Sequence, residues 1–381
     1  MNVNARGNIR SRQASPARAV GAYDWWLIGL TLVLLCLGLL MVLSSSGIVG
    51  ERLVGDKYYF FNRQLLFAGL GGVAMAVAAT IPLEKLNRWH YPLLFGAFFL
   101  LLLTLTPLGT KVNGATRWIS FKFFSVQPLE FAKIALALYL AYFMSTKQDL
   151  VKTFSKGVIP PFAVTILFCL MLLAQPDFGG AAMLAMILFF MCMVGGTRFI
   201  YLFFSVAIGL GMAVWLVVKS PYRLDRFTAF LDPLKDPQGV GYQLLQSLMA
   251  FASGGMFGVG MGGSSQKMRY LPEAHNDFIM AVLGEELGFL GVSVVMLLFL
   301  LILVRCYKII LGQPDLRDRL SAFGITLVLA LGAVLNLAVV LGMVPPKGVP
   351  MPFMSYGGSS LMCSMVCIGL LLNYSRSAHN V

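Results

Sequence analysis

The chain has 381 residues, of which 58% are apolar and only 12% are charged, and its formal net charge is +13. Soluble domains contain about 45–50% apolar and about 25% charged residues, so this composition excludes an ordinary soluble protein and indicates an integral membrane protein. The basic residues lie between apolar runs, which favours membrane phosphate over nucleic acid as their partner. The six cysteines lie in or beside apolar runs without metal-ligand spacing, so we expect neither a disulfide framework nor a metal site.

Residues 1–24 carry four arginines in a polar stretch without apolar periodicity, which predicts a disordered cytoplasmic tail. The first apolar run begins at Trp25 and is long enough to span a bilayer, so we expect an uncleaved first helix. Residues 25–375 are predicted to form one membrane domain, with a short cytoplasmic tail at 376–381. Windows of about 20 apolar residues predict ten spans. These spans are 25–46, 60–81, 91–108, 128–145, 158–174, 179–196, 199–218, 278–304, 319–343 and 356–375.

The sequence therefore predicts an all-α polytopic integral membrane protein with about ten transmembrane helices. Basic residues in alternate short loops obey the positive-inside rule when both termini are cytoplasmic, which predicts an N-in, C-in orientation. One long outward loop, 219–276, carries regular patterns and is predicted to be structured. Outward cations also occur in the short loop 109–127, which the charge rule does not explain. They indicate either an anionic ligand or contact with outer-leaflet headgroups.

Ionisable residues open the fourth predicted span. Glu130 and Lys133 are three residues apart after Pro128, so they share a helix face. Charged groups at membrane depth usually pair and often mark function, and the sequence leaves open a structural ion pair or a functional site. Asp177, in the turn before the sixth span, is predicted to cap the next helix.

The long outward loop contains a helical pattern followed by glycines. Tyr242, Leu245, Met249 and Ala252 recur at helical spacing, which predicts a helix in the interface plane that covers a site. No strand precedes the glycine run 254–263, so we reject a dinucleotide loop and expect close backbone turns at a site mouth.

An acid stands at the start of the eighth predicted span. Asp277 lies where a polar loop enters an apolar run, either as a helix cap or as a functional group. His275 is close by, and its ordinary role in such a loop is hydrogen bonding. Glu285 and Glu286 follow on the same run and are expected to anchor helix ends or to pair with inward arginines. Four prolines stiffen the last outward loop, 342–353, which presents Lys347 at a fixed position.

Several motifs together resemble the SEDS family of bacterial cell-wall proteins (shape, elongation, division, sporulation), and within it the division members. The match covers all but the N-terminal tail. The motifs are Gln127-Pro128-x-Glu130-x-x-Lys133, Gln175-Pro176-Asp177-Phe178-Gly179, Leu231-Asp232-Pro233 to Gln246-Ser247, Leu271-Pro272-Glu273-Ala274-His275-Asn276-Asp277-Phe278, Glu285-Glu286-Leu287-Gly288, and Pro350-x-Pro352-Phe353-x-Ser355-Tyr356-Gly357-Gly358-Ser359-Ser360.

The resemblance implies a peptidoglycan glycosyltransferase that polymerises lipid II at the outer face of the bacterial cytoplasmic (inner) membrane, at the division septum. It implies a class B penicillin-binding protein (a transpeptidase) and other division proteins as partners, beside membrane lipids and without nucleic acid. The family's catalytic carboxylate matches Asp277, and its buried pair matches Glu130 and Lys133. Two alternatives remain at this point, a lipid II flippase and a scaffold that recruits division proteins.

The implied chemistry suits these residue types. A sugar that leaves as a lipid pyrophosphate needs no acid to protonate it, so one carboxylate can act as the base in an inverting transfer. Asp277 is the predicted base, ranked above His275. Basic side chains would stabilise the departing charge, and a divalent cation, Mg²⁺ or Mn²⁺, could replace some of them. The outward pool consists of Arg117, Lys122, Arg223, Lys267, Arg269 and Lys347.

Overall fold

The structure is a computed structural model, and it describes residues 21–112, 114–121, 124–234, 239, 241–265 and 275–378. Within them, eight helices are long and apolar enough to cross a membrane, and two apolar helices are shorter. In chain order these ten are α1 (Trp25–Val54), α2 (Tyr59–Thr80), α4 (His90–Thr104), α5 (Pro128–Thr146), η1 with α6 (Phe154–Val158 and Ile159–Ala174), α7 (Phe178–Val194), α8 (Phe199–Val218), α12 (Ile279–Leu311), α13 (Leu316–Val340) and α14 (Gly358–Ser377). They coincide in order with the ten predicted spans, so the predicted helical membrane fold is confirmed.

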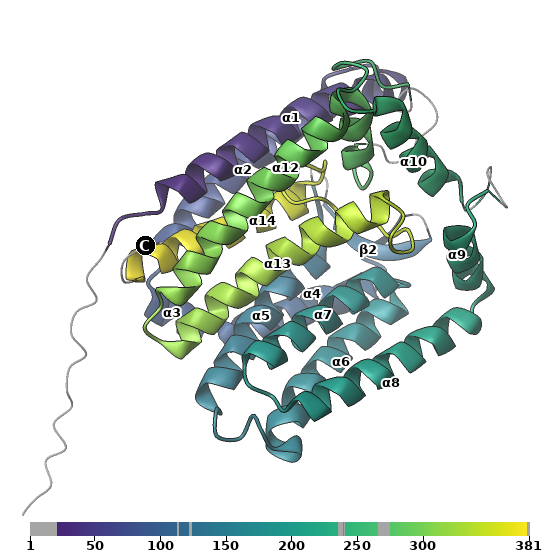
Figure 1. Cartoon of the computed structure of the whole chain (residues 1–381). Helices are drawn as coiled ribbons and strands as arrows, with labels where there is room; N and C mark the ends of the chain where they lie inside the picture. Colours follow the sequence, from purple (N-terminus) through teal and green to yellow (C-terminus); the bar gives the residue numbers. More distant parts are fainter. Residues whose placement is uncertain are drawn as a thin grey trace, which may run out of the picture.

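The first and last described residues, Gly21 and Ala378, lie at the same end of the helical bundle (Figure 1). Gly21 N–H donates to the carbonyl of Arg376, and Asp24 pairs with Arg305 at 2.8 Å. Asp24 also caps α1 by accepting from Leu27 N–H at 3.1 Å. Residues 21–24 of the predicted tail therefore contact the bundle, whereas the rest of that tail and residues 379–381 lie outside the described residues. Because the ends share one side, α5, α7, α12 and α14 all begin at the opposite end, here called the outward end.

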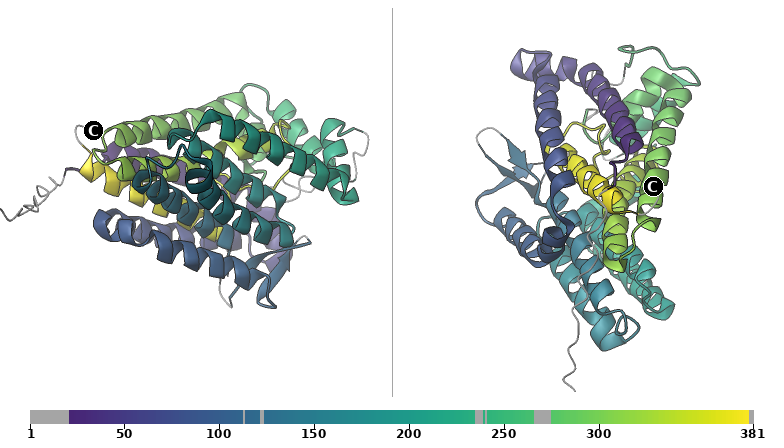
Figure 2. Two further views of the ribbon diagram at one scale, coloured as in Figure 1. Left: turned by 90° about the horizontal axis from the view of Figure 1, so that it is seen from below. Right: turned by 90° about the vertical axis from the view of Figure 1, so that its left-hand side faces the viewer.

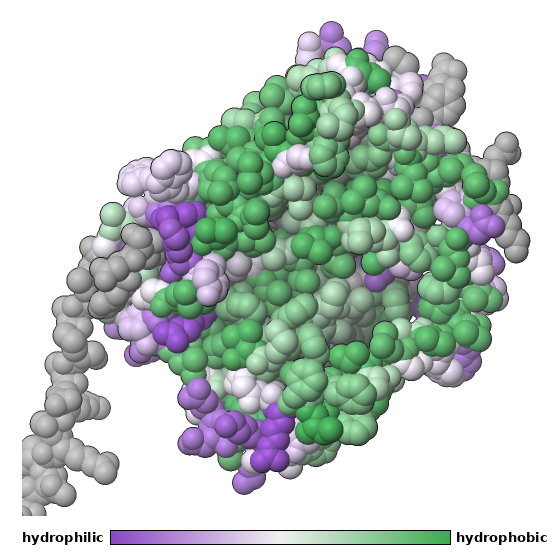
Figure 3. Space-filling model, in the orientation of Figure 1, coloured by the Kyte–Doolittle hydropathy of each residue, from purple (hydrophilic) through white to green (hydrophobic). Residues whose placement is uncertain are grey.

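The helices differ sharply in how far they are buried. In the apolar windows of α14, α5 and α13, 83%, 78% and 67% of residues are buried inside the protein, against 6% for α8. The first three helices therefore form the centre of the bundle, and α8 lies at its periphery, as Figures 1 and 2 show. A broad apolar belt covers the outer face, with hydrophilic residues gathered toward the end that carries the termini (Figure 3). Such a belt suits contact with lipid.

Short elements join the spans. Helix α3 (Leu83–Arg88) joins α2 to α4, while α9 (Pro221–Leu231) and α10 (Tyr242–Gly254) belong to the long outward loop. The loop 109–127 contains an antiparallel three-stranded sheet in the order β1-β2-β3. Its strands are β1 (Gly109–Val112), β2 (Ala115–Ser120) and β3 (Ser125–Val126). The predicted all-α fold did not include this sheet.

Helix α10 exists as predicted. The structure buries Leu244, Ser247, Ala250 and Gly254. Met249, which belongs to the predicted apolar stripe, is 45% exposed. Small residues face α12 because the backbones approach closely there: a Cβ on Gly254 would lie 2.0 Å from the carbonyl oxygen of Gly284. Leu248 and Met249 remain exposed on the outer side, which suits a helix at a membrane interface.

Helix α12 is broken at Gly288, where φ is 65° and ψ is −166°. The segment 279–286 before the break is buried throughout, so it runs within the protein rather than against lipid. The glycine-rich stretch supplies the hydrogen bonds that the break removes. Val259 and Gly260 donate to the carbonyls of Glu285 and Glu286, and Gly255 and Met256 accept from Phe289 and Leu290. The predicted continuous membrane helix at 278–304 is therefore two helical segments.

Candidate functional site

Asp277 lies in the turn that precedes α12, with its carboxylate against the backbone of Gly348. A Cβ atom on Gly348 would come within 2.7 Å of Asp277 Oδ2, so a larger residue there would displace the carboxylate. Gly348 follows Lys347 in the proline-rich loop. The fold thus joins two segments that are far apart in the sequence and that sequence analysis identified separately.

Asn336 of α13 holds these two segments together. Its side-chain amide donates to the carbonyl of Asp277 at 2.8 Å and to the carbonyl of Val349 at 2.7 Å. Asn336 is 1% exposed, so both bonds are sheltered from water. Sequence analysis missed this residue. The signal was a polar amide inside an apolar span, where polar side chains commonly have a specific partner.

Two outward cations lie near the start of α7, one of them paired with Asp177. Arg117 of β2 places Nε 3.6 Å from Asp177 Oδ1, and its Nη2 donates to the carbonyl of Pro176 at 3.0 Å. The Lys347 ammonium lies 5.1 Å from the ring centroid of Phe178. Burial lowers the pKa of Lys347, and the negative charge of Asp177 raises it in part. The structure thus brings together Arg117 and Lys347 from the predicted cation pool.

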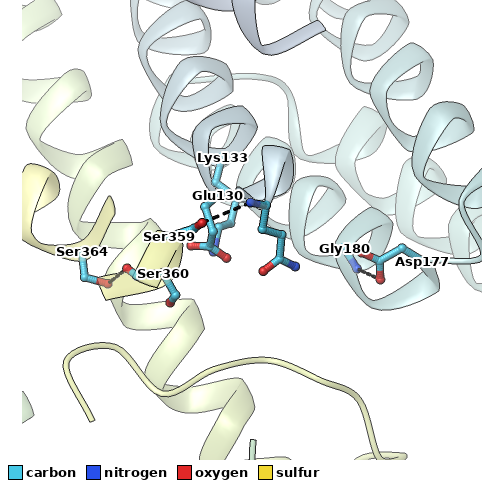
Figure 4. Close-up of polar contacts among 8 residues, drawn as sticks. Glu130, Lys133, Asp177, Gly180, Ser359, Ser360 and Ser364 are labelled. Atoms are coloured by element: carbon cyan, nitrogen blue, oxygen red, sulfur yellow. Dashed lines mark hydrogen bonds and ion pairs between the residues drawn. The ribbon is translucent and has the colours of Figure 1, made fainter. Parts of the chain in front are cut away.

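Asp177 does more than the predicted capping. Its Oδ1 does accept from Gly180 N–H at 3.0 Å, as Figure 4 shows at the start of α7, so the predicted cap is confirmed. The same carboxylate also forms the ion pair with Arg117. No pattern in the sequence indicates this second role, because β2 and α7 are brought together only by the packing of the bundle.

The remaining cations of the pool are not placed with this group. Arg223, on α9, donates to the carbonyl of Leu216 at 3.2 Å, which holds it at the corner between α8 and α9. Lys122, Lys267 and Arg269 lie outside the described residues. Among the residues that the structure does describe, no three His, Cys, Asp or Glu side chains gather as metal ligands would.

The pair predicted in the fourth span is present and buried. Lys133 Nζ donates to Glu130 Oε1 at 2.8 Å, and the two residues are 5% and 4% exposed. They border a cavity of about 10 Å³, room for roughly one water molecule. The cavity is also lined by α13, by α14 and by the loop residues Pro350 and Pro352. Figure 4 shows the pair beside Ser359 and Ser360 at the start of α14.

His275 is packed into the wall of the site. Its ring lies 4.9 Å from that of Phe60 and 5.6 Å from that of Tyr356, measured between centroids. Its carbonyl accepts from Tyr356 N–H at 2.9 Å. These contacts join the turn before α12 to α2 and to the segment before α14. His275 therefore helps to hold the turn that carries Asp277.

Glu285 and Glu286 anchor the helical segment that follows Asp277, which is the first of the two roles expected for them. Glu285 Oε1 accepts from both Ser265 N–H at 3.0 Å and Ser265 Oγ at 2.9 Å. Glu286 accepts from Ser44 Oγ of α1 at 2.7 and 2.8 Å. These contacts lie at the outward break of α12, whereas Arg305 of the same helix pairs with Asp24 at the other end.

Fold and site together define a polytopic helical membrane protein with a carboxylate and a cation group at its outward end. The chain matches the family model described as "Cell cycle protein", that of FtsW, RodA and SpoVE, over residues 25–380. A "Probable peptidoglycan glycosyltransferase FtsW" of Trichlorobacter lovleyi is 44% identical over 354 residues, 93% of each chain. "Stage V sporulation protein E" of Bacillus subtilis is 42% identical over 354 residues, 93% of this chain and 97% of that one. The chain therefore belongs to the FtsW, RodA and SpoVE family, which is the SEDS family that its motifs predict.

Solved structures agree with this assignment. A chain from "Structural coordination of polymerization and crosslinking by a peptidoglycan synthase complex" has a TM-score of 0.77 and 29% identity, over 94% of this chain and 99% of that one. The rod shape determining protein RodA of Thermus thermophilus has a TM-score of 0.71 and 29% identity, with the same coverage. The likeness extends over the whole membrane domain.

Proposed function

We infer that this protein is a peptidoglycan glycosyltransferase that polymerises lipid II during cell division. Relatives at 44% and 42% identity over more than nine tenths of the chain are named as probable peptidoglycan glycosyltransferases of the FtsW type. The observation that carries the inference within the molecule is the meeting of Asp277 with the loop of Lys347 at the outward end. A base and a cation group at one membrane face suit a transfer reaction on a lipid-linked sugar.

Asp277 is proposed as the general base. Its carboxylate would take the proton from the acceptor hydroxyl as that oxygen attacks the anomeric carbon of the donor sugar, on the face opposite the leaving group, so the configuration inverts. Asn336 and Gly348 would fix its position, since the first holds its backbone and the second leaves room for its side chain. A positioned base of this kind contributes typically about 10²–10⁴-fold to the rate.

Arg117 and Lys347 are proposed to stabilise the departing lipid pyrophosphate. Guanidinium and ammonium groups beside a developing anion, in a site with little water, lower the energy of the transition state. A Mg²⁺ or Mn²⁺ ion, where the reaction uses one, would bind the phosphate oxygens of the substrate.

The protein is further proposed to act in the cytoplasmic (inner) membrane at the septum, with a class B penicillin-binding protein that cross-links the product. This proposal rests on the division-type names of the relatives and on the fold shared with a chain of a peptidoglycan synthase complex, one that coordinates polymerisation with crosslinking. Other membrane proteins and lipids would contact the long outward loop, residues 219–276, and the belt of exposed apolar side chains.

The test is polymerisation by the purified protein with its penicillin-binding partner, with lipid II in detergent and glycan chains resolved on a gel. Wild type should form chains, and Asp277→Asn should reduce the rate by about 10²-fold or more, as expected when a general base is lost. Asp149→Asn, an exposed carboxylate between α5 and η1 at the inward end, is a matched control that should retain activity. Polymer formation by Asp277→Asn at the wild-type rate would refute the base assignment. Lipid II movement across vesicles without polymer would indicate a flippase, and neither activity would indicate a scaffold.

A further inference from the structure

Asp177 is an anion that lies beside cations at the outward end. The reaction proposed above requires cations at this place but does not require an anion. Its side chain is 8% exposed, and the nearest described cations are Arg117 and Lys347. Its helix cap alone would not require a negative charge, because serine, threonine and asparagine cap helices as well as aspartate does. The charge of Asp177 is therefore available for a second role beside Arg117 and Lys347.

We propose that Asp177 is a counterion that holds Arg117 and Lys347 in place before substrate binds. When the pyrophosphate of the substrate binds, the two cations interact with it and interact less with Asp177. The inference rests on the proposed function, because it assigns these two cations to the pyrophosphate. Asp177 is thus a positioning residue, which acts through the cations rather than on the sugar.

The geometry leaves Arg117 incompletely satisfied. Its Nη2 is bound to the carbonyl of Pro176, but Nε lies 3.6 Å from Asp177 Oδ1, beyond hydrogen-bonding range. Within the described part of the chain, this buried Nε has no hydrogen-bond partner. The Arg117 side chain as a whole is 31% exposed, so the solvent-facing part of its guanidinium can contact a second anion while Nε stays directed at the carboxylate. Arg117 is therefore oriented by the protein and still able to bind.

Lys347 is held in a complementary way. Its side chain packs close to Gly179, because a Cβ atom added to Gly179 would lie 3.3 Å from Lys347 Cδ. Its ammonium lies 5.1 Å from the ring centroid of Phe178. The flanking prolines restrict the loop that carries it. Burial lowers the pKa of this half-buried ammonium, and the charge of Asp177 opposes that shift and so favours the charged form. The carboxylate thus keeps this cation ready before substrate binds.

The charges predict how the group responds to a ligand. Two cations and one carboxylate have a formal net charge of +1, which attracts an anion. The carboxylate repels the same anion and so weakens its binding. The pyrophosphate would be held while charge develops on it and released afterwards. Without the charge of Asp177, both cations would interact only with the phosphate groups. The substrate and the released pyrophosphate would then both bind more tightly.

The test compares Asp177→Asn with wild type. Asparagine keeps an oxygen for Gly180 N–H and removes only the charge. Binding of inorganic pyrophosphate to the full protein in detergent, by calorimetry, should tighten about five-fold or more, the effect of one unit charge about 4 Å away even in water. With the partner present, the KM for lipid II should fall with it, while kcat should not rise.

Two further variants make the comparison decisive. Asp177→Ser, another capping residue without charge, should behave as Asp177→Asn does. Asp56→Asn makes the same change at an exposed carboxylate that accepts from Tyr58 N–H at 2.8 Å, and it should leave pyrophosphate affinity unchanged. In the double variant Asp177→Asn with Lys347→Gln, the gain in affinity should become smaller, because only Arg117 is then left to be released from Asp177.

Pyrophosphate affinity equal to or weaker than that of wild type in Asp177→Asn would overturn the proposal and leave Asp177 as a helix cap. A gain that persists undiminished in the double variant would also overturn it, since Lys347 would then not be the group that Asp177 restrains. The binding measurement needs no turnover. Absence of polymer from the wild type would therefore count against the proposed function, while the affinities would still decide the role of Asp177.

Discussion

Lys347 couples the site to pH. Burial lowers its pKa against the opposing charge of Asp177, and Arg117 and the Asp277 carboxylate lie in the same region. The rate of polymerisation should therefore begin to fall, as pH rises, at a lower pH than it would if Lys347 had the pKa of an ordinary lysine. Lys347→Arg, which stays charged, should move that limb to higher pH in a rate profile at saturating lipid II. An unmoved limb would show that another group controls it.

The same shift has a consequence for stability. Because the pKa of Lys347 is lower in the folded protein, the unfolded chain binds more protons between the two pKa values. The unfavourable contribution of the buried ammonium is fully present below the folded pKa and diminishes as pH rises through that window. Lys347 thus serves binding at the expense of some stability at neutral pH.

Asn336 should matter for the rate rather than for binding. Asn336→Ala would leave the buried carbonyls of Asp277 and Val349 without their donor, at about 1–3 kcal/mol each, and would loosen the base. We expect kcat to fall about ten-fold or more, with little change in KM, since a small displacement of a base has such effects. Asn373 is the matched control: its amide donates to the carbonyls of Ala78 and Ile81 at the inward end. Asn373→Ala should lower the melting temperature and leave kcat unchanged; an equal loss of kcat would contradict a local role for Asn336.

The break in α12 determines where Asp277 lies, and Gly288 permits it. Its φ of 65° with ψ of −166° is a region that only glycine adopts readily, and a Cβ would come within 2.4 Å of Gly258 N. Gly288→Ala should destabilise the fold by at least about 1–3 kcal/mol and reduce polymerisation, because the segment carrying Asp277 must shift. Gly72→Ala, in α2 with nothing within 4 Å of the added Cβ, should be neutral or stabilising. Thermal unfolding and gel assays would check both, and a Gly288→Ala protein with wild-type stability and rate would refute this account.

How far the sequence predicts this molecule depends on the kind of force involved. Lipid requires about 20 apolar residues per span, so composition located all ten helices, and charges three apart on one helix identified the pair of Glu130 and Lys133. The break at Gly288 was hidden, because its neighbours are as apolar as a continuous span. The meeting of Arg117 with Asp177, and of Asp277 with Gly348, depends on packing between distant segments. No spacing within one segment records such contacts.

The two ends of the bundle should be separable by experiment, since the ion pair of Asp24 and Arg305 lies opposite the site. Asp24→Asn keeps the cap to Leu27 N–H but leaves Arg305, whose side chain is 20% exposed, without its charge partner. Removing one member of a buried pair is strongly destabilising, and we expect a loss near the lower limit of about 3 kcal/mol, because Arg305 retains some solvent. The melting temperature should fall, whereas the KM for lipid II and the rate well below that temperature should match wild type. A changed KM at low temperature would mean that the inward end is coupled to the site, because a purely local loss of stability would leave the distant geometry of Asp277, Lys347 and Arg117 intact.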